Sequence, residues 1–173
     1  MSNIAAGTTL TTALVATADT TGALVFQTGA SATTAMTISS TQTVSFTNLL
    51  NSYTSSLGAD VNLNNISNYF DGPSVSQGTV GTWFVSGQVV VDDTAGASTL
   101  MAKLWDGTTV IDSGLADSYT TGARVCIALS GCISSPAGNL RISVRDSGST
   151  SGHIKFNASG NSKDSTITAI RIA

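Results

Sequence analysis

Glutamate is absent from the sequence, and all ten acidic residues are aspartate. Charged residues make up only 10% of the chain, against about a quarter in ordinary soluble domains. Glutamate, lysine and arginine favour helix surfaces, whereas threonine favours strands and aspartate favours turns. The scarcity of the first group and the abundance of serine and threonine therefore predict an all-β protein with short turns.

Basic residues are also scarce, and all seven lie at or after Lys103. The first 102 residues carry five aspartates and no lysine or arginine, a charge of −5, while the remainder carries seven basic and five acidic residues, a charge of +2. A nucleic-acid-binding surface needs a dense cluster of cations, so we expect no nucleic acid partner. We also expect no membrane partner, because no apolar run reaches the roughly 18 residues of a membrane-spanning helix and no basic amphipathic helix is present.

The side chains that usually carry catalysis are few. The one histidine, His153, lies in an apolar strand pattern, which favours a surface or interface position over a catalytic base. No nucleophile elbow, phosphate-binding glycine loop or zinc-protease motif occurs. Aspartates that could flank a sugar bond or hold calcium, such as Asp92-Asp93, lie in turn contexts where aspartate is common. We therefore predict a non-enzymatic protein without a cofactor or a metal site, and keep a polysaccharide hydrolase as a minor alternative.

Two cysteines, Cys126 and Cys132, lie six positions apart. A disulfide between them would require a tight turn, which Ser130-Gly131 could form. The alternative is a pair of small, partly buried thiols. We favour free thiols, because nothing else in the sequence indicates an oxidising compartment.

Residues 17–46 alternate like short β-strands separated by turns. Their apolar side chains come in pairs spaced by two, so each pair lies on one face of its strand. Six such side chains in thirty residues bury too little surface to offset the entropy of ordering the segment alone. The segment must therefore pack against copies of itself, the following domain or a larger partner. The predicted interface residues are Leu24, Phe26, Met36, Ile38, Val44 and Phe46.

From about residue 58 onward the strand patterns are longer and more apolar. The segment GTWFVSGQVVVDD has Phe84 and Val90 opposite its main apolar side, which predicts a strand covered on both faces. The Asp-Gly pair in LWDGTTVIDSG is a hairpin signal. The last strand is predicted to turn Ile170 and Ile172 inward. About eight such strands suffice for two packed antiparallel sheets.

Three segments, GTWFVSGQVVV, LWDGTTVIDSG and HIKFNASGNSKDSTITAIRIA, together resemble the jelly-roll heads of the tumour-necrosis-factor and complement globular-head superfamily. Two others, NYFDGPSVSQGTVGTWFVSG and ALVATADTTGALVFQTGASATTAMTIS, look like tail-fibre and other virion structural proteins of tailed bacteriophages. Together the resemblances cover most of the chain. They imply a homotrimer, in which the six apolar residues of the N-terminal segment meet their counterparts around a three-fold axis.

We therefore expect residues 1–57 to form an extended N-terminal β-arm for attachment or trimerisation, and residues 58–173 to form an antiparallel jelly-roll β-sandwich. The resemblance implies a non-enzymatic bacteriophage virion structural protein, either a homotrimeric capsid decoration (cement) protein or a fibre protein, attached by this arm. Its implied partners are the major capsid protein or other virion subunits, and its location is the virion, assembled in the host cytoplasm. The N-terminus is expected to be structural, because a signal peptide would need basic residues before its apolar core.

Two aromatic residues near turns, Trp105 and Tyr119, are candidate ligand contacts. An exposed ring with a nearby aspartate or asparagine can stack on a sugar. The alternative hypothesis is therefore a receptor- or carbohydrate-binding head of a tail fibre that contacts a host surface glycan. For Trp105 we favour burial at a subunit contact, where tryptophan is enriched.

Overall fold

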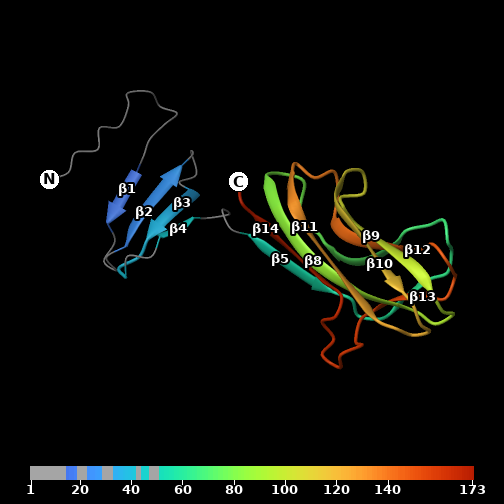
Figure 1. The fold of residues 1–173 in the computed structure, drawn as a ribbon. Coiled ribbons are helices and arrows are strands. Elements are labelled where there is room, and N and C mark those ends of the chain that lie inside the picture. The colour runs from blue at the N-terminus through green and yellow to red at the C-terminus, as the bar shows by residue number, and fades with distance from the viewer. Residues whose placement is uncertain (1–14, 19–22, 29–32, 42–43, 47–50) are drawn as a thin grey trace. The chain divides into compact units, whose positions relative to one another are not determined.

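Strands are the only regular elements in the part of the chain that the structure describes, which confirms the all-β prediction (Figure 1). The chain divides into two compact units, Met1–Leu50 and Asn51–Ala173. Within the described ranges no helix has the length and apolar character needed to span a membrane. The computed structural model describes residues 15–18, 23–28, 33–41, 44–46 and 51–173.

The first unit contains a four-stranded antiparallel sheet with the order β1-β2-β3-β4. Each strand pairs with the next one in sequence, as in a meander. This arrangement agrees with the strand-and-turn rhythm predicted for the segment. The strands are β1 (Val15–Ala18), β2 (Leu24–Thr28), β3 (Thr33–Ile38) and β4 (Val44–Phe46).

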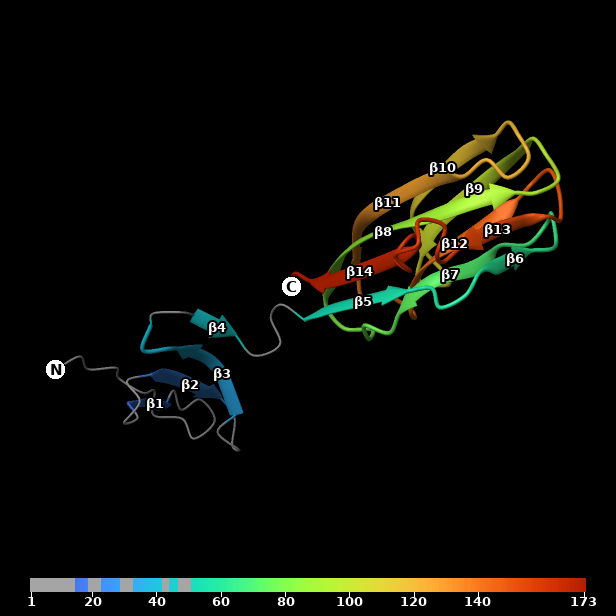
Figure 2. The ribbon, with the colours of Figure 1, turned by 90° about the horizontal axis from the view of Figure 1, so that it is seen from below.

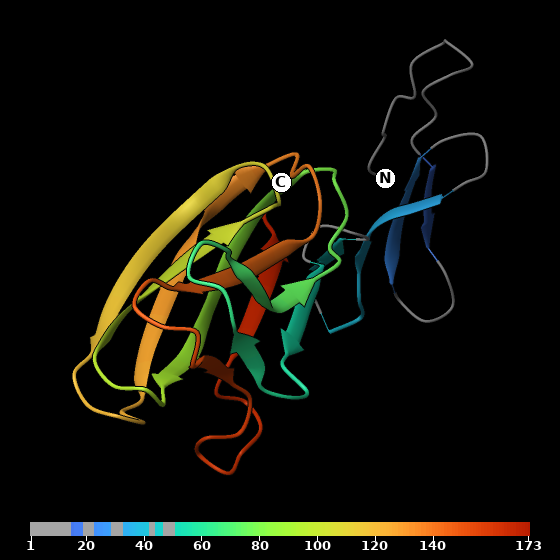
Figure 3. The ribbon, with the colours of Figure 1, turned by 90° about the vertical axis from the view of Figure 1, so that its right-hand side faces the viewer.

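The second unit is a sandwich of two antiparallel sheets, as predicted (Figure 2, Figure 3). One sheet has the order β10-β9-β12-β7, and the other has the order β5-β14-β8-β13-β6, with β11 also paired to β8. The unit has ten strands, two more than expected. They are β5 (Ser52–Ser56), β6 (Val61–Leu63), β7 (Phe70–Val75), β8 (Thr82–Asp93), β9 (Ser98–Trp105), β10 (Val110–Ser118), β11 (Val125–Ser134), β12 (Leu140–Asp146), β13 (Gly152–Lys155) and β14 (Thr166–Arg171).

The longest strand, β8, holds the larger sheet together. Strand β11 pairs with it from Thr82 to Val91 along one edge. On the other edge β14 pairs with the first half of β8 and β13 with the second half. Because each shorter strand carries a further partner, β8 joins both halves of the sheet through its backbone hydrogen bonds.

The core lies between the two sheets, where inward and outward residues alternate along each strand. Strand β9 shows this most clearly, because Leu100, Ala102 and Leu104 are at most 1% exposed while Lys103 and Trp105 occupy the partly exposed positions between and after them. The sandwich core comprises Leu63, Val75, Trp83, Val85, Val89, Val91, Leu100, Ala102, Leu104, Ile127, Leu129, Leu140, Ile142, Val144, Ile154, Ile167 and Ala169.

Two expectations about strand faces were wrong. On β8, Phe84 is 40% exposed, so this strand is not covered on both sides. On β14, Ile167 and Ala169 are fully buried, while Ile172, directly after the strand, is 48% exposed, which reverses the orientation expected for the last strand. The register explains the reversal: Ala169 lies opposite Val85, which faces the core, and directly opposed residues of antiparallel strands share a face.

The second unit begins earlier than the expected boundary between residues 57 and 58. Strand β5 pairs with β14, from Ser52 opposite Ile170 to Ser56 opposite Thr166. This backbone pairing makes β5 part of the sandwich. Its sequence, SYTSS, has no apolar alternation, which is why the sequence pattern did not mark it as a strand of the larger unit.

The two cysteines, Cys126 and Cys132, are free and exposed. Both lie on β11, and six residues of extended strand separate them by roughly 20 Å, far beyond disulfide reach. Ser130-Gly131 continues the strand and makes no turn. The prediction of free thiols is confirmed, but the expectation that they are partly buried was wrong.

Gly87 in the middle of β8 permits close packing of the two sheets. A Cβ atom there would lie 2.6 Å from the Thr166 carbonyl oxygen and 2.9 Å from Ile142 Cδ1. We predict that Gly87→Ala lowers the free energy of unfolding by about 1–3 kcal/mol, because it overpacks the core. Gly58→Ala is the matched control, since nothing lies within 4 Å of its added Cβ. Urea unfolding of both variants measures the difference, and equal stabilities would contradict the packing described.

Candidate functional site

The backbone register places the predicted interface residues in adjacent positions of the first unit's sheet. Directly opposed residues share a face, and so do residues two apart on one strand. Strands β2, β3 and β4 therefore carry two neighbouring apolar rows. One row is Leu24, Ile38 and Val44, and the other is Phe26, Met36 and, by backbone position, Phe46.

This apolar face is only partly buried. Val44 is 49% exposed, and Leu24, Phe26, Met36 and Ile38 are all of intermediate exposure. No residue of the first unit whose burial is described belongs to the hydrophobic core. Among the described residues of this unit, no second sheet or helix covers the face. The face therefore carries apolar side chains like those of a core layer, but the described residues of this unit provide no second layer to pack against it.

A pocket of about 340 Å³ lies against the start of β9, the end of β10 and the segment after β12. Tyr119, predicted as a ligand contact, lines it and is 79% exposed. Its hydroxyl lies 3.5 Å from Asp117 Oδ2, and Thr99 Oγ1 donates a hydrogen bond to Asp117 Oδ1 at 2.7 Å. An exposed aromatic ring beside a fixed carboxylate offers both a stacking surface and a hydrogen-bond acceptor.

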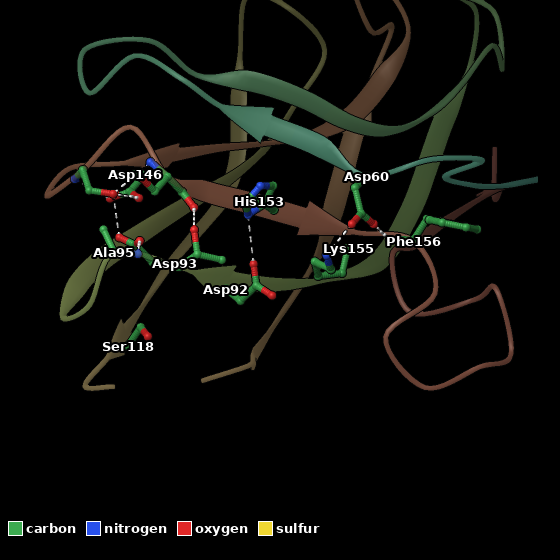
Figure 4. A network of polar contacts seen from close by, with 12 residues as sticks. Asp60, Asp92, Asp93, Ala95, Ser118, Asp146, His153, Lys155 and Phe156 are labelled. Carbon is green, nitrogen blue, oxygen red and sulfur yellow. Dashed lines mark hydrogen bonds and ion pairs between the residues drawn. The ribbon is translucent and has the colours of Figure 1, made fainter. Parts of the chain in front are cut away.

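Two buried carboxylates, Asp93 and Asp146, fix the loops next to this pocket (Figure 4). Asp146 Oδ1 accepts a hydrogen bond from Ser98 Oγ. It also accepts hydrogen bonds from the backbone N–H of Gly148 at 2.9 Å and of Ser149 at 3.1 Å. Ser149 Oγ in turn donates to Asp93 Oδ2 at 2.8 Å. Because Ser98 and Gly148 line the pocket, this network makes its wall rigid.

The protonation of Asp146 follows from these contacts. Burial acts to raise the pKa of its carboxyl, but the hydrogen bonds donated by Ser98, Gly148 and Ser149 outweigh burial and hold the pKa below the ordinary value of 3.8. Asp146 is therefore ionised at neutral pH, when the hydrogen bonds to its carboxylate are strongest.

Polar contacts continue along β13, where one lysine forms an ion pair (Figure 4). His153 Nδ1 lies 3.2 Å from Asp92 Oδ1, with the histidine side chain 26% exposed and the aspartate 7% exposed. Lys155 pairs with Asp60, whose Oδ1 accepts the Phe156 N–H at 2.9 Å. Within the described ranges, no group of three or more His, Cys, Asp or Glu residues could hold a metal ion.

Trp105 and Tyr119, the two predicted ligand contacts, do not form one site. Thr99 at the pocket and Trp105 lie six residues apart on β9, a separation of roughly 20 Å. The Trp105 indole N–H donates to Ser143 Oγ at 2.6 Å, and Lys103 Nζ lies 3.3 Å from the centre of its ring. Contacts within the chain therefore already engage the Trp105 ring, whereas the Tyr119 ring is exposed.

Sequence reasoning missed the network of Asp93, Asp146 and Ser149. These residues come from two loops far apart in the sequence, and only the fold brings them together. A signal was present: each aspartate ends an apolar strand and precedes small turn residues, the context in which aspartate side chains bind nearby backbone N–H groups.

Comparisons with known proteins show the fold. No family model matches the sequence, and no curated protein matches it. Among solved structures, the chain is similar to Eiger TNF from S. frugiperda, with 12% identity, coverage of 73% of this chain and 94% of that one, and a TM-score of 0.51. This likeness supports the jelly-roll fold of the sandwich and, at that identity, nothing beyond the fold.

Two further likenesses are too weak to support an argument. One is to the C-terminal CBM6 of LamC from Zobellia galactanivorans, with 16% identity, coverage of 72% of this chain and 90% of that one, and a TM-score of 0.35. The other is to infectious bursal disease virus, Gt strain, with 13% identity, coverage of 88% of this chain and 48% of that one, and a TM-score of 0.37.

Asp146→Asn tests the network beside the pocket. We predict that the free energy of unfolding falls by about 1–3 kcal/mol at pH 7, because the amide keeps one acceptor oxygen but loses the negative charge that strengthens the hydrogen bonds from Ser98, Gly148 and Ser149. The folded-state pKa is depressed, so the stabilisation is fully present above pH 3.8, the ordinary pKa, and is lost as the pH falls through the folded value. Urea unfolding should show a smaller difference in free energy of unfolding between wild type and variant at pH 3 than at pH 7. A difference that is the same at both pH values would contradict this account.

Proposed function

We propose that this chain is a non-enzymatic virion structural protein of a tailed bacteriophage, acting as a homotrimeric capsid decoration or fibre protein. Its N-terminal unit attaches it to the major capsid protein or to another virion subunit. The observation that carries the proposal is the apolar face of β2, β3 and β4, which no second layer covers among the described residues of its unit.

Covering that face supplies the free energy for assembly. Each large apolar side chain that becomes fully buried contributes about 1.5–3 kcal/mol. Three copies of the sheet arranged around an axis bury their apolar rows against one another, and the contact closes without leaving a sheet exposed. The resemblance of the sequence to jelly-roll heads, which implies three-fold packing, supports the same arrangement.

The mechanism is mechanical. A trimer that bridges neighbouring subunits adds buried area across their seams, and this raises the free energy needed to separate them. The sandwich has its own complete core, so it forms a separately folded head.

Met36→Lys tests the apolar face. Met36 lies in the middle strand of the apolar rows, so a charge there must lose its hydration whenever the face is covered. We predict that the purified wild-type chain is a trimer by multi-angle light scattering and that Met36→Lys shifts it to monomer.

Thr37→Lys is the matched control, because the next residue of the same strand points to the opposite face. It adds the same charge and should leave the trimer intact. A monomeric wild type would contradict the trimer, and equal behaviour of the two variants would contradict the assignment of this face.

A carbohydrate-binding head is the second candidate, favoured by the exposed Tyr119 ring at the pocket. The ring can stack on a sugar while Asp117 Oδ2 accepts a hydrogen bond from a sugar hydroxyl. In this case the pocket recognises a host surface glycan and the N-terminal unit retains its attachment role.

Tyr119→Ala distinguishes the second candidate. On a glycan array, we predict that the wild type binds at least one neutral saccharide and that the variant loses this binding by about tenfold or more, because it lacks the stacking surface. Val80→Ala, which truncates a side chain that is 70% exposed and does not line the pocket, should bind as the wild type does. A silent array, or equal binding by Tyr119→Ala, would remove this candidate.

A further inference from the structure

The outer face of the β10-β9-β12-β7 sheet gathers three cations and two aromatic rings. On this face Arg141 of β12 lies opposite Trp105 of β9, and Ser143 lies opposite Lys103. Residues alternate along a strand, so Arg145 follows on the same side of β12, diagonal to Lys103. The cations are therefore neighbours on one sheet surface.

The rings and the cations alternate across this face. Lys103 Nζ lies 3.3 Å from the centre of the Trp105 ring and 4.4 Å from the centre of the Tyr69 ring. Arg141 Cζ lies 4.9 Å from the centre of the Trp105 ring, and Arg145 Cζ lies 5.4 Å from that of Tyr69. We call this series, Arg141–Trp105–Lys103–Tyr69–Arg145, the cation–aromatic ladder.

The positive charge of the ladder is incompletely paired. Asp71 Oδ2 lies 3.4 Å from Arg141 Nη1, and Asp71 Oδ1 accepts a hydrogen bond from Ser143 Oγ at 2.6 Å. In the described part of the chain, neither Lys103 nor Arg145 has a carboxylate at ion-pair distance. Three cations and Asp71 together give the ladder a charge of +2, in a chain whose net charge is −3.

Hydrogen-bonding capacity is also unused here. Arg145 Nη2 contacts only the thioether sulfur of Met101, at 3.0 Å, which is a weak acceptor. The Nε atoms of Arg141 and Arg145 are buried without a hydrogen-bond partner, which is rare for buried donors in folded proteins. Burial, and then the nearby Arg141 charge, lower the pKa of Lys103 against the opposing effect of Asp71. An oxyanion bound at this surface would supply a stronger acceptor to Arg145 Nη2 and a counter-charge to Lys103 and Arg145.

We propose that the cation–aromatic ladder binds an acidic saccharide through its sulfate or carboxylate groups. Lys103 and Arg145 bind the oxyanion, and the Tyr69 ring, which is 37% exposed, presents an apolar border to the sugar. A nucleic acid is a poorer fit, because three cations on one face of an acidic chain cannot neutralise a run of phosphates. The inference goes beyond the proposed function, because it names a class of sugar and a surface separate from the Tyr119 pocket.

Isothermal titration of the full-length protein tests the inference with defined probes. The probes are a heparin-derived hexasaccharide, which carries sulfates, an oligogalacturonate, which carries only carboxylates, and neutral dextran. We expect at least one acidic saccharide to bind, dextran not to bind, and the affinity to fall as salt rises, since the contacts are charged. The two acidic probes distinguish sulfate recognition from carboxylate recognition.

Lys103→Gln and Arg145→Gln should each weaken this binding by about tenfold, the effect of losing one charge-assisted hydrogen bond. Lys163→Gln removes the same charge from an exposed position outside the ladder and should bind as the wild type does. Thermal unfolding of each variant verifies that the sandwich is intact. If a ladder variant fails to fold, Met101→Ala provides a second test. This variant removes the sulfur contact of Arg145 but keeps the Arg145 charge, so it should retain binding.

Three results would overturn the inference: neither acidic saccharide binds, Lys163→Gln weakens binding as much as the ladder variants, or poly-glutamate binds as tightly as the saccharides. Light scattering on the same samples measures the oligomeric state, so a failure of the ladder site can be distinguished from a failure of the proposed trimer. A trimer that binds no acidic saccharide would contradict the ladder site alone, and a monomer that binds it would contradict the trimer alone.

Discussion

An amphipathic β-sheet is stable only when its apolar face is covered, and the two units of this chain meet that constraint differently. In the sandwich each sheet covers the other, so residues such as Val89 and Leu104 are fully buried. The sheet of the first unit has apolar rows of the same kind, but the described part of that unit contains no second layer. The proposed assembly follows from this difference.

The completed core of the sandwich leaves its outer surfaces available for other roles. Strand β9 serves the core and two outer sites through its alternation: Leu100 and Leu104 enter the core, whereas Thr99 lies at the pocket and Lys103 and Trp105 belong to the cation–aromatic ladder. One rigid strand thus positions the polar groups of two separate surfaces. Buried carboxylates at the loops add hydrogen bonds that keep the pocket fixed.

Local patterns in the sequence predicted what depends on alternation. The all-β class and the two-sheet sandwich followed from composition and period-two spacing. The same reasoning misjudged the last strand, because both faces of β14 carry isoleucine and only its pairing with β8 decides which one enters the core. Contacts between distant segments, such as Asp93 with Ser149 or Tyr69 with Lys103, could not be predicted from local patterns, because only the fold brings those segments together. The strand β5 was missed because its residues are polar.

Hydrogen–deuterium exchange of the full-length chain at several protein concentrations tests most directly whether the first unit borrows its stability from other copies. If intermolecular burial holds β2 and β3 together, their amide protection rises with protein concentration while that of β8 and β9 stays constant. Strong protection of β2 and β3 that does not change on dilution to monomer would contradict this account, because it would show that the sheet is stable within a single chain.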